Sequence, residues 1–192
     1  KATMFNHNTY FSNSFNSKFI RNIFLRSSSI QNKWTANSDT GSNIDSIKSQ
    51  DLWMEDNVYV GGEIGISAGG NTDYDTGPRW QNITIINNVL MAIGRDQPTN
   101  RTLGWNIDAY DWDGGLICGN YILNTDNLAV SGLIGIKLGG HSRDVRIAEN
   151  TLHGLITSSP SSIAGAITVN SSPKENITIS KNNIQLANSK MR

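Results

Sequence analysis

Apolar and polar residues alternate in a short pattern that returns along the chain about every 30 residues. In the clearest copy, residues 145–152, Val145 and Ile147 are followed by Asn150 and Leu152. Similar segments occupy residues 52–59, 83–90, 115–122 and 177–184, with a weaker copy at 5–10. Alternation with a period of two predicts a strand with one buried face. Its recurrence at a fixed interval predicts a solenoid.

Stacking the copies predicts columns of like side chains. One inward column is expected to hold Ile147, Ile117, Ile85, Met54 and Ile179, and a second Leu152, Ile122, Leu90, Tyr59 and Ile184. A third column, at a bend, would hold Asn8, Asn57, Asn88, Asn120, Asn150 and Asn182. Asn suits this place because it tolerates the left-handed conformation, and stacked amides can bond from one coil to the next.

A second set of apolar pairs runs out of phase with the first and precedes turns rich in Gly, Asn or Ser. Its members are Ile23/Leu25, Ile66/Ala68, Ile107/Ala109, Ile136/Leu138 and Ile167/Val169. Each coil then carries at least two strands, which favours a parallel β-helix over a hairpin fold. The pattern resembles the right-handed parallel β-helix superfamily of pectate-lyase-like proteins over nearly the whole chain. The resemblance implies an all-β, right-handed parallel β-helix of about six coils, with residues 1–192 as one domain.

Three polar stretches interrupt the repeats and are expected to be loops that leave the stack: 31–48, 71–80 and 94–104. Functional residues in solenoids gather where loops leave one face. The middle coils are therefore the expected place of a site.

Composition narrows the possible partners and the compartment. The formal net charge is zero, so a nucleic-acid partner has no electrostatic support. No transmembrane run or signal peptide is visible, and no membrane association is expected. Abundant Asn, Ser, Gly and Thr are typical of secreted or cell-surface β-rich proteins. Because the chain starts directly in a repeat, we expect a longer helix, a partner chain or self-association to cover an open end.

The densest cluster of chemical groups is the segment 104–115. If Ile107 and Ala109 face inward, Asn106, Asp108 and Tyr110 share the outward face. Asp111, Trp112 and Asp113 would then occupy the following turn. Carboxylates beside aromatic rings are typical of sugar sites, because sugar C–H faces are apolar and hydroxyls need acceptors.

The same segment looks like the Gly-Ile-Asp-Leu-Asp-Asp-Gly turn of β-helix glycosidases, with Asn106 in place of Gly and aromatic residues interleaved. The resemblance implies that the catalytic acids are Asp108, Asp111 and Asp113. The aromatic and polar side chains around these acids give the expected substrate-binding residues, which are Trp105, Asn106, Tyr110, Trp112 and Lys137. Hydrolysis needs two carboxyl groups about 5–5.5 Å or about 6.5–9.5 Å apart. The alternative is that Asp111 and Asp113 accept backbone N–H bonds in a turn.

Lys137 aligns with Asp108 one coil away, with Ser67 and Thr168 on either side, so the two charges are expected about 5 Å apart. Lys137 either forms a weak ion pair with Asp108 or keeps that carboxylate ionised. Glu63 is expected about 13 Å from Asp108, too far for a catalytic pair. No His pair has metal-ligand spacing and no cofactor is expected, except that Asp73 and Asp75 could bind Ca²⁺ together with Asp111 or Asp113.

Three functions follow from these residues. The first is a carbohydrate-active protein, a glycoside hydrolase that acts on a polysaccharide or oligosaccharide through Asp carboxylates. The second is a non-catalytic β-helix: a spike, an adhesin or a filament subunit. The third is a polysaccharide lyase in which Lys137 abstracts the proton.

Overall fold

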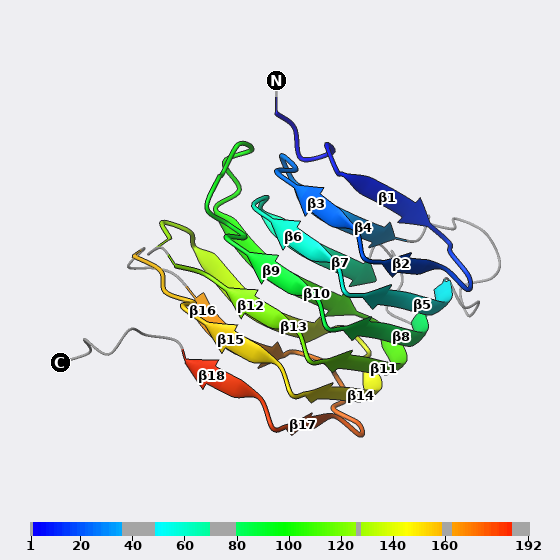
Figure 1. Cartoon of the computed structure of the whole chain (residues 1–192). Coiled ribbons are helices and arrows are strands. Elements are labelled where there is room, and N and C mark those ends of the chain that lie inside the picture. The colour runs from blue at the N-terminus through cyan, green and yellow to red at the C-terminus, as the bar shows by residue number, and fades with distance from the viewer. Residues whose placement is uncertain (1, 36–48, 70–79, 126–127, 159–162, 186–192) are drawn as a thin grey trace.

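The computed structural model describes residues 2–35, 49–69, 80–125, 128–158 and 163–185. Within these ranges the chain contains no helix, and its strands form three parallel sheets of six strands each (Figure 1). Successive strands go to successive sheets, so each coil adds one strand to every sheet. The expected all-β parallel β-helix is therefore confirmed, and none of the described residues forms a helix that could span a membrane.

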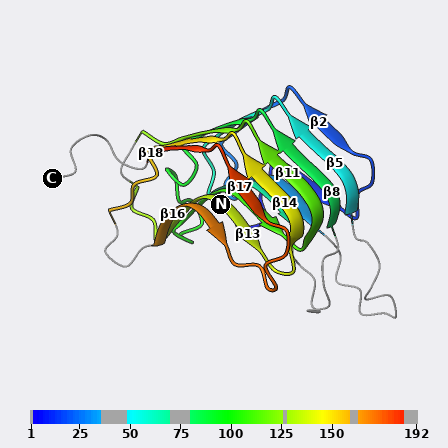
Figure 2. The same ribbon diagram turned by 90° about the horizontal axis from the view of Figure 1, so that it is seen from below.

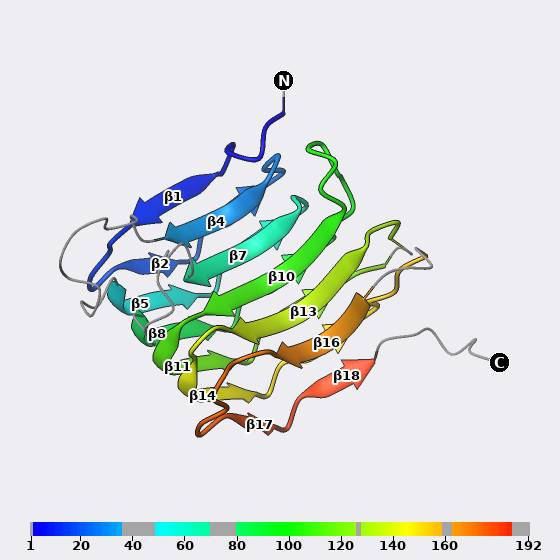
Figure 3. The same cartoon turned by 180° about the vertical axis from the view of Figure 1, so that it is seen from behind.

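Sheet A, seen in Figure 3, consists of β1 (Thr9–Ser12), β4 (Ile30–Thr35), β7 (Ile64–Gly69), β10 (Leu103–Tyr110), β13 (Gly132–Gly139) and β16 (Ile163–Val169). Sheet B consists of β2 (Lys18–Ile20), β5 (Ser49–Glu55), β8 (Trp80–Ile86), β11 (Trp112–Cys118), β14 (Arg143–Ala148) and β17 (Thr178–Ser180). Sheet C consists of β3 (Ile23–Leu25), β6 (Val58–Val60), β9 (Val89–Met91), β12 (Tyr121–Leu123), β15 (Thr151–His153) and β18 (Asn183–Gln185). The strands of sheet B lie stacked side by side in Figure 2.

The two predicted apolar columns are present in register. Met54, Ile85, Ile117, Ile147 and Ile179 are paired along sheet B. Tyr59, Leu90, Ile122, Leu152 and Ile184 are paired along sheet C. Each copy of the Asn-containing repeat therefore supplies two strands, one to sheet B and one to sheet C, because an Asn corner divides it. Each coil has three strands.

The predicted column of asparagines forms this corner, and we call it the Asn ladder. Asn57, Asn88, Asn120 and Asn150 are fully buried. Each of their backbone N–H and Nδ2 groups donates to the side-chain oxygen of the Asn in the next coil, as Asn88 does to Asn120 at 2.9 and 3.0 Å. The left-handed conformation falls on the residue before each Asn, as at Asn87 with a φ of 56°. The side-chain amides thus provide the hydrogen-bond acceptors for the backbone N–H groups at this corner.

The first coil differs from the prediction. Asn22, and not Asn8, begins the Asn ladder, because Asn22 donates to Asn57. Ile23 and Leu25 belong to sheet C and are 70% and 57% exposed, so their expected place among the out-of-phase apolar pairs, with Ile66 and Ala68, was wrong. Asn32 and Trp34 of β4 occupy that place in sheet A. The expectation that a longer helix, a partner or a second copy covers an end of the stack remains a prediction.

The predicted bounds of two loops include residues that belong to strands. Residues 31–35 are part of β4, and residues 103–104 are part of β10. What remains of the first loop, and all of the second except Trp80, lies outside the described residues. The third loop spans residues 94–102 between β9 and β10.

Sheet A has a bend that changes which residues face outward. In successive strands two adjacent residues point inward: Gln31 with Asn32, Gly65 with Ile66, Asn106 with Ile107, and Gly135 with Ile136. The bend leaves little room, since a Cβ added at Gly65 would lie 2.6 Å from the Asn106 carbonyl oxygen. Two adjacent inward residues reverse the alternation, so Trp105 faces outward and Asn106 inward.

Candidate functional site

The three predicted acids do not share one surface. Asp108 lies on the outward face of sheet A, and Asp111 lies at the corner between sheets A and B. Asp113 lies near the start of β11 in sheet B. The three acids are close in sequence, but the segment that carries them passes around the corner of the β-helix from sheet A to sheet B.

Asp108 and Lys137 form the centre of the sheet A surface. They are in register, with Ser67 and Thr168 on either side as predicted. Lys137 Nζ lies 3.1 Å from Asp108 Oδ1, and the two side chains are 19% and 15% exposed. The contact has the distance of an ion pair, although Asp108 Oδ1 accepts no aligned hydrogen bond. Lys33, one coil beyond Ser67, is half-buried, and burial lowers its pKa.

Two aromatic rings border this ion pair. Lys137 Nζ lies 4.1 Å from the centroid of the Trp105 ring and 6.0 Å from that of Tyr110. Because the ammonium covers one face of the half-buried Trp105, Tyr110 is the better platform, with 38% of its surface exposed. A Cβ at Gly139 would lie 2.7 Å from the Tyr110 ring, so a glycine is needed where the ring crosses the next coil.

A depression of about 220 Å³ lies beside Tyr110. Gly140, His141, Asn170 and Ser172 complete its lining. Amide, hydroxyl and imidazole groups thus stand next to an exposed phenol ring. His141, Asn170 and Ser172 were not predicted as site residues, because they lie one and two coils beyond Tyr110 in segments without a local motif.

Trp112 and Asn106 were predicted to contact substrate, and both predictions were wrong. Trp112 is fully buried, and its Nε1 donates to the Ala68 carbonyl at 2.9 Å. Asn106 is also fully buried, and its Nδ2 donates to the Ile134 carbonyl at 3.0 Å. The bend in sheet A places Asn106 inside. Alignment of the two coils would have indicated that Trp112 is buried, because Trp112 pairs with the buried Trp80 of the previous coil.

Asp111 has the structural role given above as the alternative, because it accepts a backbone N–H hydrogen bond at a turn. It takes the left-handed conformation with a φ of 61°, and its Oδ1 accepts the His141 backbone N–H at 2.9 Å. Only 4% of the residue is exposed. A carboxylate that is buried and holds a corner in this way has little access to a sugar.

Asp113 is held by an arginine from the next coil. Arg143 Nε and Nη2 donate to its two oxygens at 3.0 and 2.9 Å. The hydrogen bonds from Arg143 lower the pKa of Asp113, against a smaller opposing effect of burial. The pair therefore keeps Asp113 ionised and oriented toward Arg143.

We expect an Asp113 pKa below its ordinary value in the intact protein and a higher one in the Arg143→Gln variant. The check is a ¹³C NMR titration of the Asp113 carboxyl carbon. Because the folded pKa is depressed, the pair stabilises the fold above the unfolded pKa, and this contribution is lost as the pH falls through the folded pKa. Equal titration curves in both proteins would contradict the assignment.

Glu63 was set aside as a catalytic partner, and the structure gives it another role. It is fully buried. It accepts hydrogen bonds from the Thr99 backbone N–H at 2.9 Å and from Arg101 Nε at 2.7 Å. Glu63 thus fastens the loop 94–102 to the preceding coil.

Among the residues that the structure describes, no group of three or more His, Cys, Asp or Glu side chains could hold a metal ion. Asp73 and Asp75, expected to bind Ca²⁺ with the corner acids, lie outside the described residues. That expectation remains a prediction.

Comparison with known proteins gave no match to a family model, to a curated protein or to a solved structure.

Proposed function

We propose that the protein is a carbohydrate-binding β-helix whose glycan surface is the outer face of sheet A, from Asp108 to the depression beside Tyr110. The observation that supports this most is the exposed Tyr110 ring between a charged pair and a polar depression. Aromatic rings stack on the apolar faces of sugars, and amides, hydroxyls and carboxylates bind their hydroxyl groups.

Binding without hydrolysis fits the acids better than a glycoside hydrolase does. Hydrolysis requires two carboxyl groups on either side of one glycosidic bond. Asp108 faces outward from sheet A, Asp111 is buried, and Asp113 is bound to Arg143 on sheet B. A lyase would use Lys137 as a neutral base, whereas its Nζ is in an ion pair with Asp108. The non-catalytic alternative, with a secreted or cell-surface location, is therefore the one we favour.

The Tyr110→Ala variant is expected to bind glycans at least about tenfold more weakly, a loss of about 1.4 kcal/mol, because the stacking platform is removed. Affinity is measured by isothermal titration calorimetry with the ligands that the intact protein binds on a glycan array. Tyr121→Ala is the matched control, since Tyr121 of sheet C is 49% exposed and lies on another face. We expect its affinity to be unchanged.

Two outcomes would overturn this proposal. One is full affinity in Tyr110→Ala for every bound glycan. The other is the release of shorter sugars by the intact protein, lost in Asp108→Asn, which would restore the hydrolase hypothesis.

A further inference from the structure

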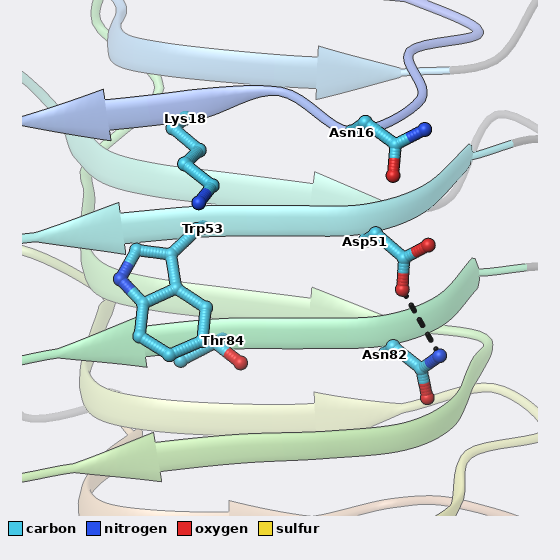
Figure 4. Close-up of a pocket in the computed structure, with 6 residues that line it drawn as sticks. All are labelled: Asn16, Lys18, Asp51, Trp53, Asn82 and Thr84. Atoms are coloured by element: carbon cyan, nitrogen blue, oxygen red, sulfur yellow. Dashed lines mark hydrogen bonds between the residues drawn. The ribbon is translucent and has the colours of Figure 1, made fainter.

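A second surface lies on the outer face of sheet B, around the corner from Tyr110. Strands β2, β5 and β8 border a groove of about 260 Å³ (Figure 4). Its lining consists of Asn16, Lys18, Asp51, Trp53, Asn82 and Thr84. None of these residues belongs to the surface proposed on sheet A.

Trp53 supplies an aromatic face to this groove. It lies between the fully buried Leu52 and Met54, so period-two alternation points it outward, and it is 36% exposed. Its Nε1 donates to Glu55 Oε2 at 2.8 Å, which fixes the ring and satisfies its one polar group. In Figure 4 the broad side of the indole faces the viewer, with Thr84 of the neighbouring strand behind it. An apolar ring held in this way is a stacking surface that the core does not use.

A row of polar side chains stands beside the ring. Asn16, Asp51 and Asn82 take the left-handed conformation, with φ of 52°, 56° and 54°. Asn82 Nδ2 donates to Asp51 Oδ1 at 3.0 Å. This bond orients the Asp51 carboxylate, and it leaves Asp51 Oδ2 and Asn82 Oδ1 as acceptors at the rim of the groove (Figure 4). Rows of oriented carboxylate and amide oxygens suit the hydroxyl groups of a sugar.

Charge and size restrict the ligand. Among the described residues, the charged side chains that line the groove are Lys18 and Asp51, whose charges cancel. This described lining contains no arginine, the side chain best suited to bind an anion through two hydrogen bonds. A phosphate or a uronate would also meet the Asp51 carboxylate. A volume of about 260 Å³ is near the lower end of the ligand pockets of proteins, about 300–1,000 Å³, which suits one sugar ring of a longer chain.

We propose that this groove is a second glycan site that takes a neutral pyranose unit. The C–H face of the sugar stacks on Trp53, and its hydroxyls donate to Asp51 and Asn82. The site is separate from the surface on sheet A, so either one can fail without the other.

The test uses the intact protein with neutral hexasaccharides of glucose, mannose, galactose and xylose. A binding sugar is expected to shift the indole N–H signal of Trp53 in ¹⁵N NMR spectra and to shield this residue from acrylamide quenching. Trp53→Ala should weaken binding at this site at least tenfold. Asp51→Asn should weaken it severalfold, and Trp53→Phe should keep most of the affinity because the aromatic face remains. Since all of these side chains are on the surface, far-UV circular dichroism should show unchanged folding.

Tyr110→Ala separates the two proposals, because it should leave the Trp53 shift intact. The second site is overturned if none of the four sugars moves the Trp53 signal at about 10 mM, some tenfold above the ~1 mM dissociation constant of a weak binder. It is equally overturned if a sugar binds Trp53→Ala as tightly as the intact protein. A loss of affinity confined to Tyr110→Ala would support the sheet A surface alone.

Discussion

Replacing Asn120 with alanine is expected to lower the free energy of unfolding by about 3–5 kcal/mol. The Asn120 side chain accepts from the Asn88 backbone N–H and from Asn88 Nδ2, and it donates to the Ile85 carbonyl and to Asn150. All of these bonds are buried. Each lost bond costs about 1 kcal/mol, and a buried N–H left without an acceptor costs about 1–3 kcal/mol. Urea denaturation followed by circular dichroism measures the loss.

Asn22→Ala is the matched control for this experiment. Asn22 begins the same Asn ladder, but it is exposed, and among the described residues its side chain only donates, to Ile20 and Asn57. Its replacement should cost about 1 kcal/mol or less, because water can satisfy the groups that it leaves. Equal losses in both variants would mean that burial of the Asn ladder does not set its contribution to stability.

Glu63→Ala is expected to destabilise the protein by about 3–5 kcal/mol, because it leaves Arg101 without its buried partner. Arg101 Nη2 lies 2.6 Å from Glu63 Oε2, with the carboxylate fully buried and the arginine side chain 23% exposed. The Thr99 N–H also loses its acceptor. The loop 94–102 should then open, so hydrogen exchange at Thr99 should become faster. Urea denaturation gives the free energy, and exchange mass spectrometry gives the local effect.

The matched control for this variant is Glu149→Ala. Glu149 also pairs with an arginine, Arg146, at 3.4 Å, but both side chains are about half exposed. Exposed pairs are worth at most about 1 kcal/mol. A Glu63→Ala protein as stable as Glu149→Ala, with unchanged exchange at Thr99, would rule out the anchoring role of Glu63.

Much of the fold could be predicted because, in a solenoid, residues that pair in adjacent coils recur at a nearly constant interval in the sequence. Ile85, Ile117 and Ile147 recur at one point in each coil, and each must face the core, so their alignment gives both the strands and the parallel pairing. The third strand of each coil was missed, since the Asn corner does not interrupt the apolar pattern. The first coil was misaligned because Ile23 and Leu25, although apolar, face outward.

The candidate site was predictable only where it followed that register. Asp108 and Lys137 occupy equivalent places in adjacent coils, so their contact could be read from the alignment. Asn106 could not, because the bend in sheet A puts two neighbouring residues inside. The groove at Trp53 depends on the left-handed residues Asp51 and Asn82, a backbone conformation that alternation of apolar residues does not report.

The Asn ladder also bears on how such a chain can change length in evolution. Successive asparagines from Asn22 to Asn182 are separated by 35, 31, 32, 30 and 32 residues, yet each makes the same bonds to the next. Insertions of several residues are thus absorbed between one corner and the following one. Duplicating or excising a segment that runs from one asparagine to the next would rejoin equivalent corners, whereas a cut at half that length would bring an apolar strand against a corner. The architecture therefore favours gain and loss of whole turns as its unit of variation.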